Sequence, residues 1–300
     1  MKAKVKDESI QMSQLRGKHV LLAVAVTAII LISAVVVLYS FSNQPGLPKA
    51  AIIDELSSST LYNSSRYVND TFVNTTRTKL LERFPEVDYY RDNATVDQYR
   101  LLPSKGYKLI VWRAHSALDN VSKYIAITTS ETYVSESYNS YFDNNQLTLT
   151  MISGDPKRYI AITPKFVEEV MTGRFEDTVI VFMSCNGLKA GYSATAEAFK
   201  AKGVKVFISW DGWINTDDND NSITRLLDYL ISQNNTVGQA VGRFPTPTFT
   251  YLDGPSSLCY YPNNSDAANY IIPNYKANVT ANISGLLAIP VTSRKIIRPD

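Results

Sequence analysis

The chain has 300 residues, of which 45% are hydrophobic and 19% are charged, and its formal net charge at pH 7 is +2. This length and apolar content are enough for a core of ordinary size, and the nearly neutral charge argues against nucleic acid as a partner. The sequence contains neither a phosphate-binding glycine loop nor a zinc-spaced cluster of cysteine and histidine. We therefore expect no cofactor, apart from the calcium option described below.

The N-terminal part of the sequence has the pattern of a membrane anchor. Residues 1–19 are polar and basic, whereas residues 20–41 are uncharged and apolar throughout. A helix of this length spans a hydrocarbon core of ~30 Å. The first basic residue after it is Lys49, so the positive-inside rule places the N-terminus in the cytoplasm. A cleaved signal peptide is the alternative, but its apolar core is usually only about 7–15 residues long.

These features predict a single-pass protein of the cell membrane. Its parts are a cytoplasmic segment (1–19), a transmembrane signal anchor in the lipid bilayer (20–41), a linker (42–49) and an extracytoplasmic domain (50–300). Asn-x-Ser/Thr sequons occur only after the anchor, which fits an exported glycoprotein. The glycosylation candidates are Asn63, Asn69, Asn74, Asn93, Asn120, Asn234, Asn263, Asn278 and Asn282.

After the linker, short apolar runs alternate with segments of helical spacing. Residues 50–56 fit either a strand or a short helix, and we favour a strand. This alternation over about 200 residues predicts an α/β domain with a mostly parallel central sheet. The expected strands are 50–56, 86–90, 107–114, 124–133, 158–163, 178–183 and 204–210, and the expected helices are 67–84, 164–173, 192–201, 222–232 and 236–241. For residues 245–300 we expect loops and an edge hairpin.

Two of these runs end on reactive side chains. The run TVIVFMSCNGL at 178–188 leads into Cys185, and the run YKLIVWRAHSAL at 107–118 contains His115. Continuous apolar runs of this kind are typical of buried parallel strands, and ligands bind at the carboxyl ends of such strands. We therefore expect both side chains at one edge of the sheet.

A cysteine beside a histidine suits acyl transfer, most simply peptide hydrolysis. The thiolate is the nucleophile, and an imidazole activates it and then protonates the leaving amine. The backbone N–H groups of Ser116 and Cys185 are the expected oxyanion donors, and Gly187 keeps the following turn open. The alternative is structural: Cys185 and Cys259 would form a disulfide in an oxidising compartment.

The segments IVWRAHS and VIVFMSCNG resemble the histidine and cysteine blocks of the caspase-like cysteine peptidases, which include clostripain, the gingipains, separase and the CHAT domains. Residues 194–230 resemble the CHAT order of helix, glycine, strand, tryptophan, Asp-rich turn and helix. The resemblance covers roughly residues 105–245. One departure is Ser116, since the family usually has glycine directly after the histidine.

The resemblance implies a caspase-like α/β sandwich and a cysteine-type endopeptidase that acts on a peptide or protein substrate. Cys185 would be the nucleophile and His115 the general acid/base. A catalytically inactive caspase-like surface glycoprotein that binds a partner is the alternative. A third hypothesis is a plain glycoprotein with a structural disulfide.

The family builds its substrate pocket partly from the strand after the cysteine. Here Asp211 would receive a basic side chain of the substrate and Trp210 would form a wall of the pocket. Alternatively, Asp211 makes a turn and both Trp210 and Trp213 belong to the core.

Asp217, Asn219 and Asn221 also place oxygen atoms at the alternating positions of a calcium loop. We favour a solvated turn that caps a helix beginning near residue 222.

Overall fold

The computed structural model describes Ser33 and residues 47–276. The chain divides into two units, Met1–Gly46 and Leu47–Asp300, and the second unit contains the folded domain. The predicted anchor at 20–41, apart from Ser33, and the sequons Asn278 and Asn282 lie outside the described residues. Among the residues that the structure does describe, no helix has the length and apolar character needed to cross a membrane.

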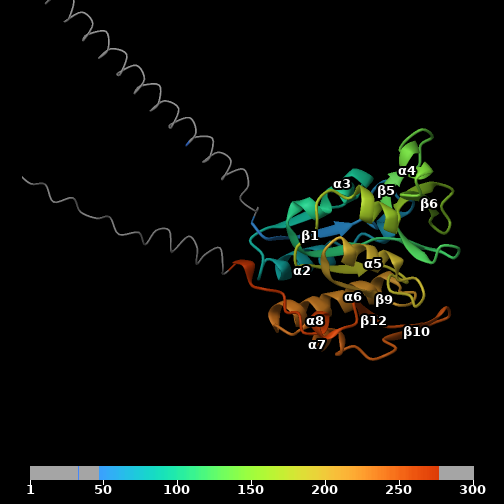
Figure 1. The fold of residues 1–300 in the computed structure, drawn as a ribbon. Helices are drawn as coiled ribbons and strands as arrows, with labels where there is room; N and C mark the ends of the chain where they lie inside the picture. The colour runs from blue at the N-terminus through green and yellow to red at the C-terminus, as the bar shows by residue number, and fades with distance from the viewer. Residues whose placement is uncertain (1–32, 34–46, 277–300) are drawn as a thin grey trace, which may run out of the picture. The chain divides into compact units, whose positions relative to one another are not determined.

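A six-stranded sheet forms the centre of the domain (Figure 1). Five of its strands are parallel, and one edge strand runs antiparallel to its neighbour β9. The predicted α/β class with a mostly parallel sheet is therefore confirmed. In spatial order the strands are β12 (Leu258–Tyr261), β9 (Val204–Trp210), β8 (Thr178–Met183), β3 (Tyr107–Arg113), β1 (Lys49–Asp54) and β2 (Val87–Tyr90).

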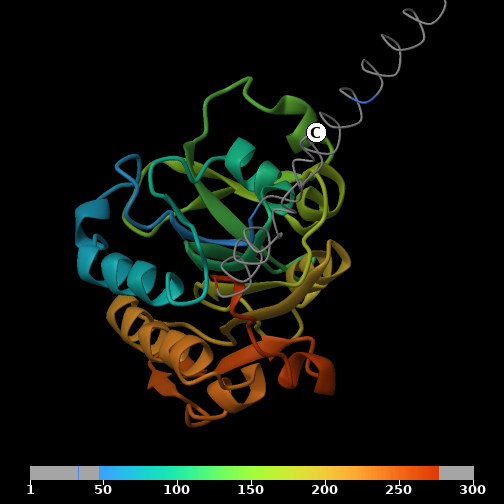
Figure 2. The ribbon, with the colours of Figure 1, turned by 90° about the vertical axis from the view of Figure 1, so that its left-hand side faces the viewer.

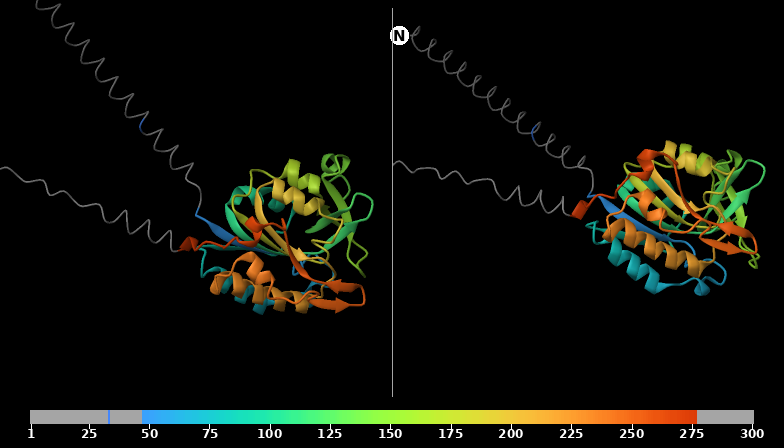
Figure 3. Two further views of the ribbon diagram at one scale, coloured as in Figure 1. Left: turned by 60° about the horizontal axis from the view of Figure 1, so that its bottom comes forward. Right: turned by 90° about the horizontal axis from the view of Figure 1, so that it is seen from below.

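Each face of this sheet is covered, because its inner strands are apolar at successive positions and bury side chains on both sides. Ile52, Val111 and Val181 pack with helices α2 (Asp70–Leu80) and α6 (Thr216–Leu227). These two helices lie side by side (Figures 2 and 3). The opposite face packs on α3 (Val96–Leu101), η3 (Phe166–Val170), α5 (Ala194–Ala201) and a second sheet.

The second sheet is four-stranded and antiparallel, in the order β4 (Ser116–Asp119), β5 (Tyr124–Thr132), β7 (Arg158–Ile162) and β6 (Leu147–Met151). The expected hairpin after residue 245 is present as β10 (Phe249–Tyr251) and β11 (Gly254–Ser256), which project from the body of the domain (Figure 3). After the hairpin the chain adds β12 to the edge of the main sheet. Helix α8 (Ser265–Ala268) follows and packs against α7 (Val237–Val241), which precedes the hairpin in the chain.

Helix α6 differs from its prediction because it begins at Thr216 instead of residue 222. The side chain of Asn215 accepts a hydrogen bond from the backbone N–H of Asp218 at 2.8 Å, and two acidic residues stand in the first turn, an arrangement that stabilises a helix N-terminus. Asp217, Asn219 and Asn221 are therefore helical, and residues two apart on a helix do not face each other. They do not converge as a calcium loop requires.

The described sequons differ in exposure. Asn69 is partly buried: it caps α2 by accepting from Phe72 N–H, and its amide donates to Asp220 at 3.0 Å. The asparagines of the other six described sequons are exposed, namely Asn63, Asn74, Asn93, Asn120, Asn234 and Asn263.

A buried ion network joins the end of β3 to β1 and α6. The guanidinium of Arg113, which is 1% exposed, donates to Asp220 at 2.8 and 2.9 Å and to Asp54 at 2.9 Å. Burial raises the pKa of Asp220, and the ion pair with Arg113 opposes this rise. The network holds the chain in place immediately before His115.

Replacing Arg113 with methionine should lower the free energy of unfolding by about 3–5 kcal/mol, because two buried carboxylates then lose their shared cation. Urea denaturation of the purified chain measures this change. The matched control is Arg77→Met, at an exposed position on α2, which should change stability by less than about 0.5 kcal/mol. A loss below about 1 kcal/mol for Arg113→Met would contradict a structural role for the network.

Candidate functional site

His115 and Cys185 come to one cleft because their strands are neighbours. Strands β3 and β8 pair in parallel, with Arg113 opposite Met183 in the last pair. Both side chains follow two residues later, at the carboxyl edge of the sheet. The cleft has a volume of about 290 Å³ and is lined by Leu56, Arg66, Tyr67, Ala114, His115, Ser116, Met183, Ser184, Cys185, Trp213, Ile214, Asn215, Thr216 and Asn219.

The main chain on both sides of His115 is anchored. Its N–H donates to a carboxyl oxygen of Glu55 at 2.9 Å, and its carbonyl accepts from Thr128 N–H at 3.0 Å. The imidazole meets the Tyr67 ring edge to face, with centroids 5.5 Å apart. Nε2 is shielded from solvent and has no hydrogen-bond partner among the described residues.

Burial and nearby positive charge keep the imidazole neutral. Burial, together with the charges of Arg113 and Arg66, lowers the pKa of His115 to about 4. At neutral pH the ring therefore carries one proton and has a free lone pair. A neutral imidazole beside a nucleophile can accept a proton from it.

The thiol of Cys185 is also neutral at rest. Its Sγ donates to the carbonyl of Ile214 at 3.4 Å. Burial raises the pKa of this thiol, although backbone groups of Ile214 and of Cys185 itself act in the opposite direction. No hydrogen bond links the thiol to the imidazole among the described contacts. The resting pair is therefore a thiol and an imidazole rather than an ion pair.

The turn after Cys185 is shaped by packing against β9. Asn186 adopts a left-handed φ of 57°, and its N–H donates to the carbonyl of Gly212 at 2.7 Å. A Cβ on Gly187 would lie 2.1 Å from the Oγ of Ser209. The glycine is thus required by the neighbouring strand, and not by the approach of a substrate as its position in the sequence suggested.

Ser116 contacts the cysteine loop directly. Its hydroxyl donates to the carbonyl of Cys185 at 2.6 Å, so its side chain bridges the two segments of the site. The carbonyl of His115 accepts a hydrogen bond from Thr128 N–H, and Ser116 pairs with Ile127 at the next position of the β4–β5 ladder. Alternate pairs of an antiparallel ladder make no mutual hydrogen bonds, so the N–H of Ser116 points away from β5.

Glu55 is a part of the site that the sequence pattern did not single out. It is fully buried, one carboxyl oxygen binds His115 N–H, and the other has no partner among the described residues. Burial raises its pKa well above the usual range. The available signal was the acidic pair Asp54-Glu55 within the predicted strand at 50–56, which reads equally well as a surface turn.

The expected substrate pocket is arranged differently from its prediction. Trp210 is fully buried and donates to Asn219 at 2.9 Å, so it belongs to the core. Asp211 accepts from Ser257 N–H at 2.6 Å and lines a neighbouring pocket of about 510 Å³ instead of the cleft. Trp213, which is 40% exposed, lines both cavities. Trp213, and not Trp210, is the tryptophan that lines the cleft.

The two cysteines of the domain are free thiols. Cys259 lies on β12 opposite Ser209 and donates to the carboxylate of Asp211 at 3.8 Å. Burial and this carboxylate raise the pKa of Cys259 to about 11. The Cys185–Cys259 disulfide that the sequence left open is absent from this structure.

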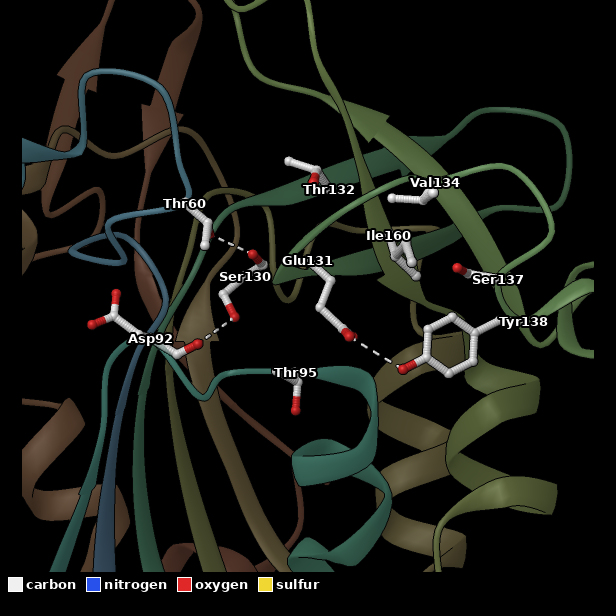
Figure 4. A pocket seen from close by; sticks show the side chains of 10 residues that line it. All are labelled: Thr60, Asp92, Thr95, Ser130, Glu131, Thr132, Val134, Ser137, Tyr138 and Ile160. Atoms are coloured by element: carbon white, nitrogen blue, oxygen red, sulfur yellow. Dashed lines mark hydrogen bonds between the residues drawn. The ribbon is translucent and has the colours of Figure 1, made fainter.

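Another pocket, of about 320 Å³, lies beside β5 and α3 (Figure 4). Its main acidic group, Glu131, uses both carboxyl oxygens: one accepts from Val96 N–H at 2.7 Å and the other from Tyr138 hydroxyl at 3.1 Å. Neither cysteine nor histidine lines it. Glu131 thus ties the start of α3 to the segment that contains Tyr138.

No protein-family model matches the chain, and no curated protein matches it in sequence. Its function is therefore inferred from the chemistry of the cleft.

Alkylation of Cys185 should reveal the neutral resting pair. In a Cys259→Ser background, the rate with iodoacetamide should keep rising through about pH 9 without a plateau between about pH 5 and 8, because the raised thiol pKa leaves little thiolate in that range. Mass spectrometry of the Cys185 peptide measures the rate. His115→Ala should change it less than about twofold near pH 7. A plateau below pH 7 that disappears in His115→Ala would instead reveal an ion pair.

Proposed function

We propose that the domain is a caspase-like cysteine endopeptidase with Cys185 as nucleophile and His115 as general acid/base. One observation carries the proposal: a thiol and an imidazole whose Nε2 has no hydrogen-bond partner line the same cleft, each shortly after one of two adjacent parallel strands. This is the position at which ligands bind in open α/β sheets. The order of strand, histidine, strand and cysteine also agrees with the family resemblance of the sequence.

The residues of the cleft support a two-step acyl transfer. As the Cys185 sulfur attacks the scissile carbonyl carbon, its proton passes to His115 Nε2, and the carbonyl π electrons move onto oxygen. The N–H groups of Ser116 and Cys185 stabilise that oxyanion. The intermediate collapses to a thioester, and His115 gives its proton to the leaving amine. Water, deprotonated by His115, then hydrolyses the thioester and releases the carboxylic acid and the thiol.

The low basicity of His115 determines when this chemistry can occur. An imidazole with a pKa of about 4 has a weak driving force for removing a proton from a thiol of raised pKa. We therefore place proton transfer in the substrate complex, where it is coupled to the attack itself, and not in the free enzyme.

We also propose that the domain is held outside the cell membrane by residues 20–41, as a single-pass glycoprotein. Support comes from the apolar run and from the exposure of six described sequons. Strand β1 begins at Lys49, next to the linker, and the cleft lies beyond the opposite ends of the parallel strands. Within the domain, the chain thus enters at the end remote from the cleft.

A catalytically inactive binding domain is the second candidate. It is favoured by the absence of a thiol–imidazole hydrogen bond and by Ser116, whose side chain occupies space where the family usually has glycine. Such a domain would keep the cleft but use it to bind a partner.

A peptide screen separates these two functions. The purified chain should cleave members of a fluorogenic peptide library, and a peptide acyloxymethyl ketone should modify Cys185. Cys185→Ser should abolish cleavage, and His115→Ala should lower kcat/KM by about 10²–10⁴-fold, as expected for loss of a general acid/base. Cys259→Ser is the matched control and should retain activity within about twofold.

The contrary result would be alkylation of Cys185 by iodoacetamide with neither cleavage nor labelling by any peptide ketone. In that case the thiol is accessible but not catalytic, and the binding domain becomes the better explanation.

A further inference from the structure

Two residues that line the cleft each carry a buried polar atom without a partner. These atoms are Nε2 of His115 and the hydroxyl oxygen of Ser184, a residue that is only 3% exposed. Neither atom has a hydrogen-bond partner among the described residues. Buried polar groups are nearly always bonded, and an exception calls for a reason such as a role in catalysis or a bound water. Because both atoms belong to one cleft, one reason can serve both.

The strand pairing places Ser184 beside the reactive residues. Arg113 on β3 is opposite Met183 on β8 in the last pair of the two strands. Ser184 is the next residue on the β8 side and directly precedes Cys185, while His115 stands two residues beyond Arg113. Ser184 thus adjoins the nucleophile and follows the strand that neighbours the one leading to the imidazole.

Other polar side chains of the cleft are already bonded. The hydroxyl of Ser116 donates to the carbonyl of Cys185 at 2.6 Å, the side chain of Asn219 accepts from Trp210 at 2.9 Å, and Asn215 caps α6. The cleft, at about 290 Å³, is several times larger than the ~30 Å³ that a water molecule occupies in the liquid. A water molecule therefore has both room and two polar partners in the cleft.

We propose that Ser184 is a positioning residue that holds the hydrolytic water of the second reaction step beside His115; this assignment rests on the proposed peptidase function. The water donates one hydrogen to Nε2 of His115 and the other to the hydroxyl oxygen of Ser184. A lone pair of the water oxygen then faces the thioester carbon on Cys185. The imidazole can accept this hydrogen because burial and nearby positive charge lower its pKa to about 4, which leaves it neutral.

The second step balances without a change in Ser184. The water oxygen bonds to the thioester carbon while one water proton passes to Nε2 of His115 and the carbonyl π electrons move onto oxygen. The intermediate collapses, the carbon–sulfur bond breaks, and the proton on His115 passes to the leaving sulfur. The products are the carboxylic acid and the free thiol. Since the first step uses no water, loss of the Ser184 hydroxyl should slow the second step alone.

A p-nitrophenyl ester of an N-acylated peptide separates the two steps on the full chain, with Cys259→Ser as the parent. Release of p-nitrophenol has a fast phase, the acylation of Cys185, and a slow phase, the hydrolysis of the thioester. In Ser184→Ala the fast phase should stay within about twofold, whereas the slow phase should fall about tenfold because the water is no longer oriented. Intact-mass spectrometry during turnover should show a larger fraction of acylated Cys185.

The matched control is Thr76→Val. Thr76 lies on α2 and also has a buried hydroxyl without a described partner, but it does not line the cleft. Both phases should be unchanged in this variant. In urea denaturation Ser184→Ala should be as stable as the parent, because its hydroxyl has no described partner to lose.

Hydroxylamine provides a readout that a purely structural role would not move. It attacks the thioester in place of water and does not need the oriented water. Added hydroxylamine should therefore speed the slow phase of Ser184→Ala by a larger factor than that of the parent.

The outcomes separate this role from the peptidase itself. An unchanged slow phase in Ser184→Ala, or a fast phase that falls as much as the slow phase, overturns the role of Ser184 and leaves the peptidase proposal standing. A parent that shows neither a fast phase nor acylated Cys185 with any ester overturns the peptidase proposal and the role of Ser184 together.

Discussion

The candidate site depends on the parallel pairing of β3 with β8. The two strands share their last register pair, Arg113 opposite Met183, so both chains leave the sheet at the same level. Each places its reactive residue two positions later, and the two side chains therefore face one cleft although 70 positions separate them in the sequence. A shift in register would separate the thiol from the imidazole without changing either strand.

The polar groups behind the cleft are unusually deeply buried. Arg113 is bonded to two buried carboxylates, and Glu55 holds the main chain of His115 from a fully buried position. Burial of charged groups is costly unless they are paired. Arg113 is paired with Asp54 and Asp220, whereas the raised pKa of Glu55 favours its neutral form. Burial also favours the neutral forms of the Cys185 thiol and the His115 imidazole.

Much of the sheet could be predicted, because long β-branched runs such as 178–183 have few alternatives to a buried strand. The pocket could not. Trp210 ends β9 and Trp213 follows three residues later, and their types do not reveal which one is buried. The hydrogen bond of Trp210 to Asn219 on α6 decides it. Asp211 was expected in the cleft, but a bond to Ser257 from a distant segment draws it away. Helix α6 begins earlier than predicted because the side chain of Asn215 caps its N-terminus.

The sequence by itself determined the α/β class and the strands that carry His115 and Cys185, because these follow from local apolar patterns and the length of each run. The membrane anchor at 20–41 stays a prediction, since it lies outside the described residues apart from Ser33. Only the tertiary structure decided that the cysteines are free, that Glu55 bonds to the main chain of His115 and that Asp211 lies outside the cleft. These outcomes depend on contacts between segments far apart in the chain. Burial and pairing across such contacts set the protonation and the charge of the site, and neither is encoded in local sequence periodicity.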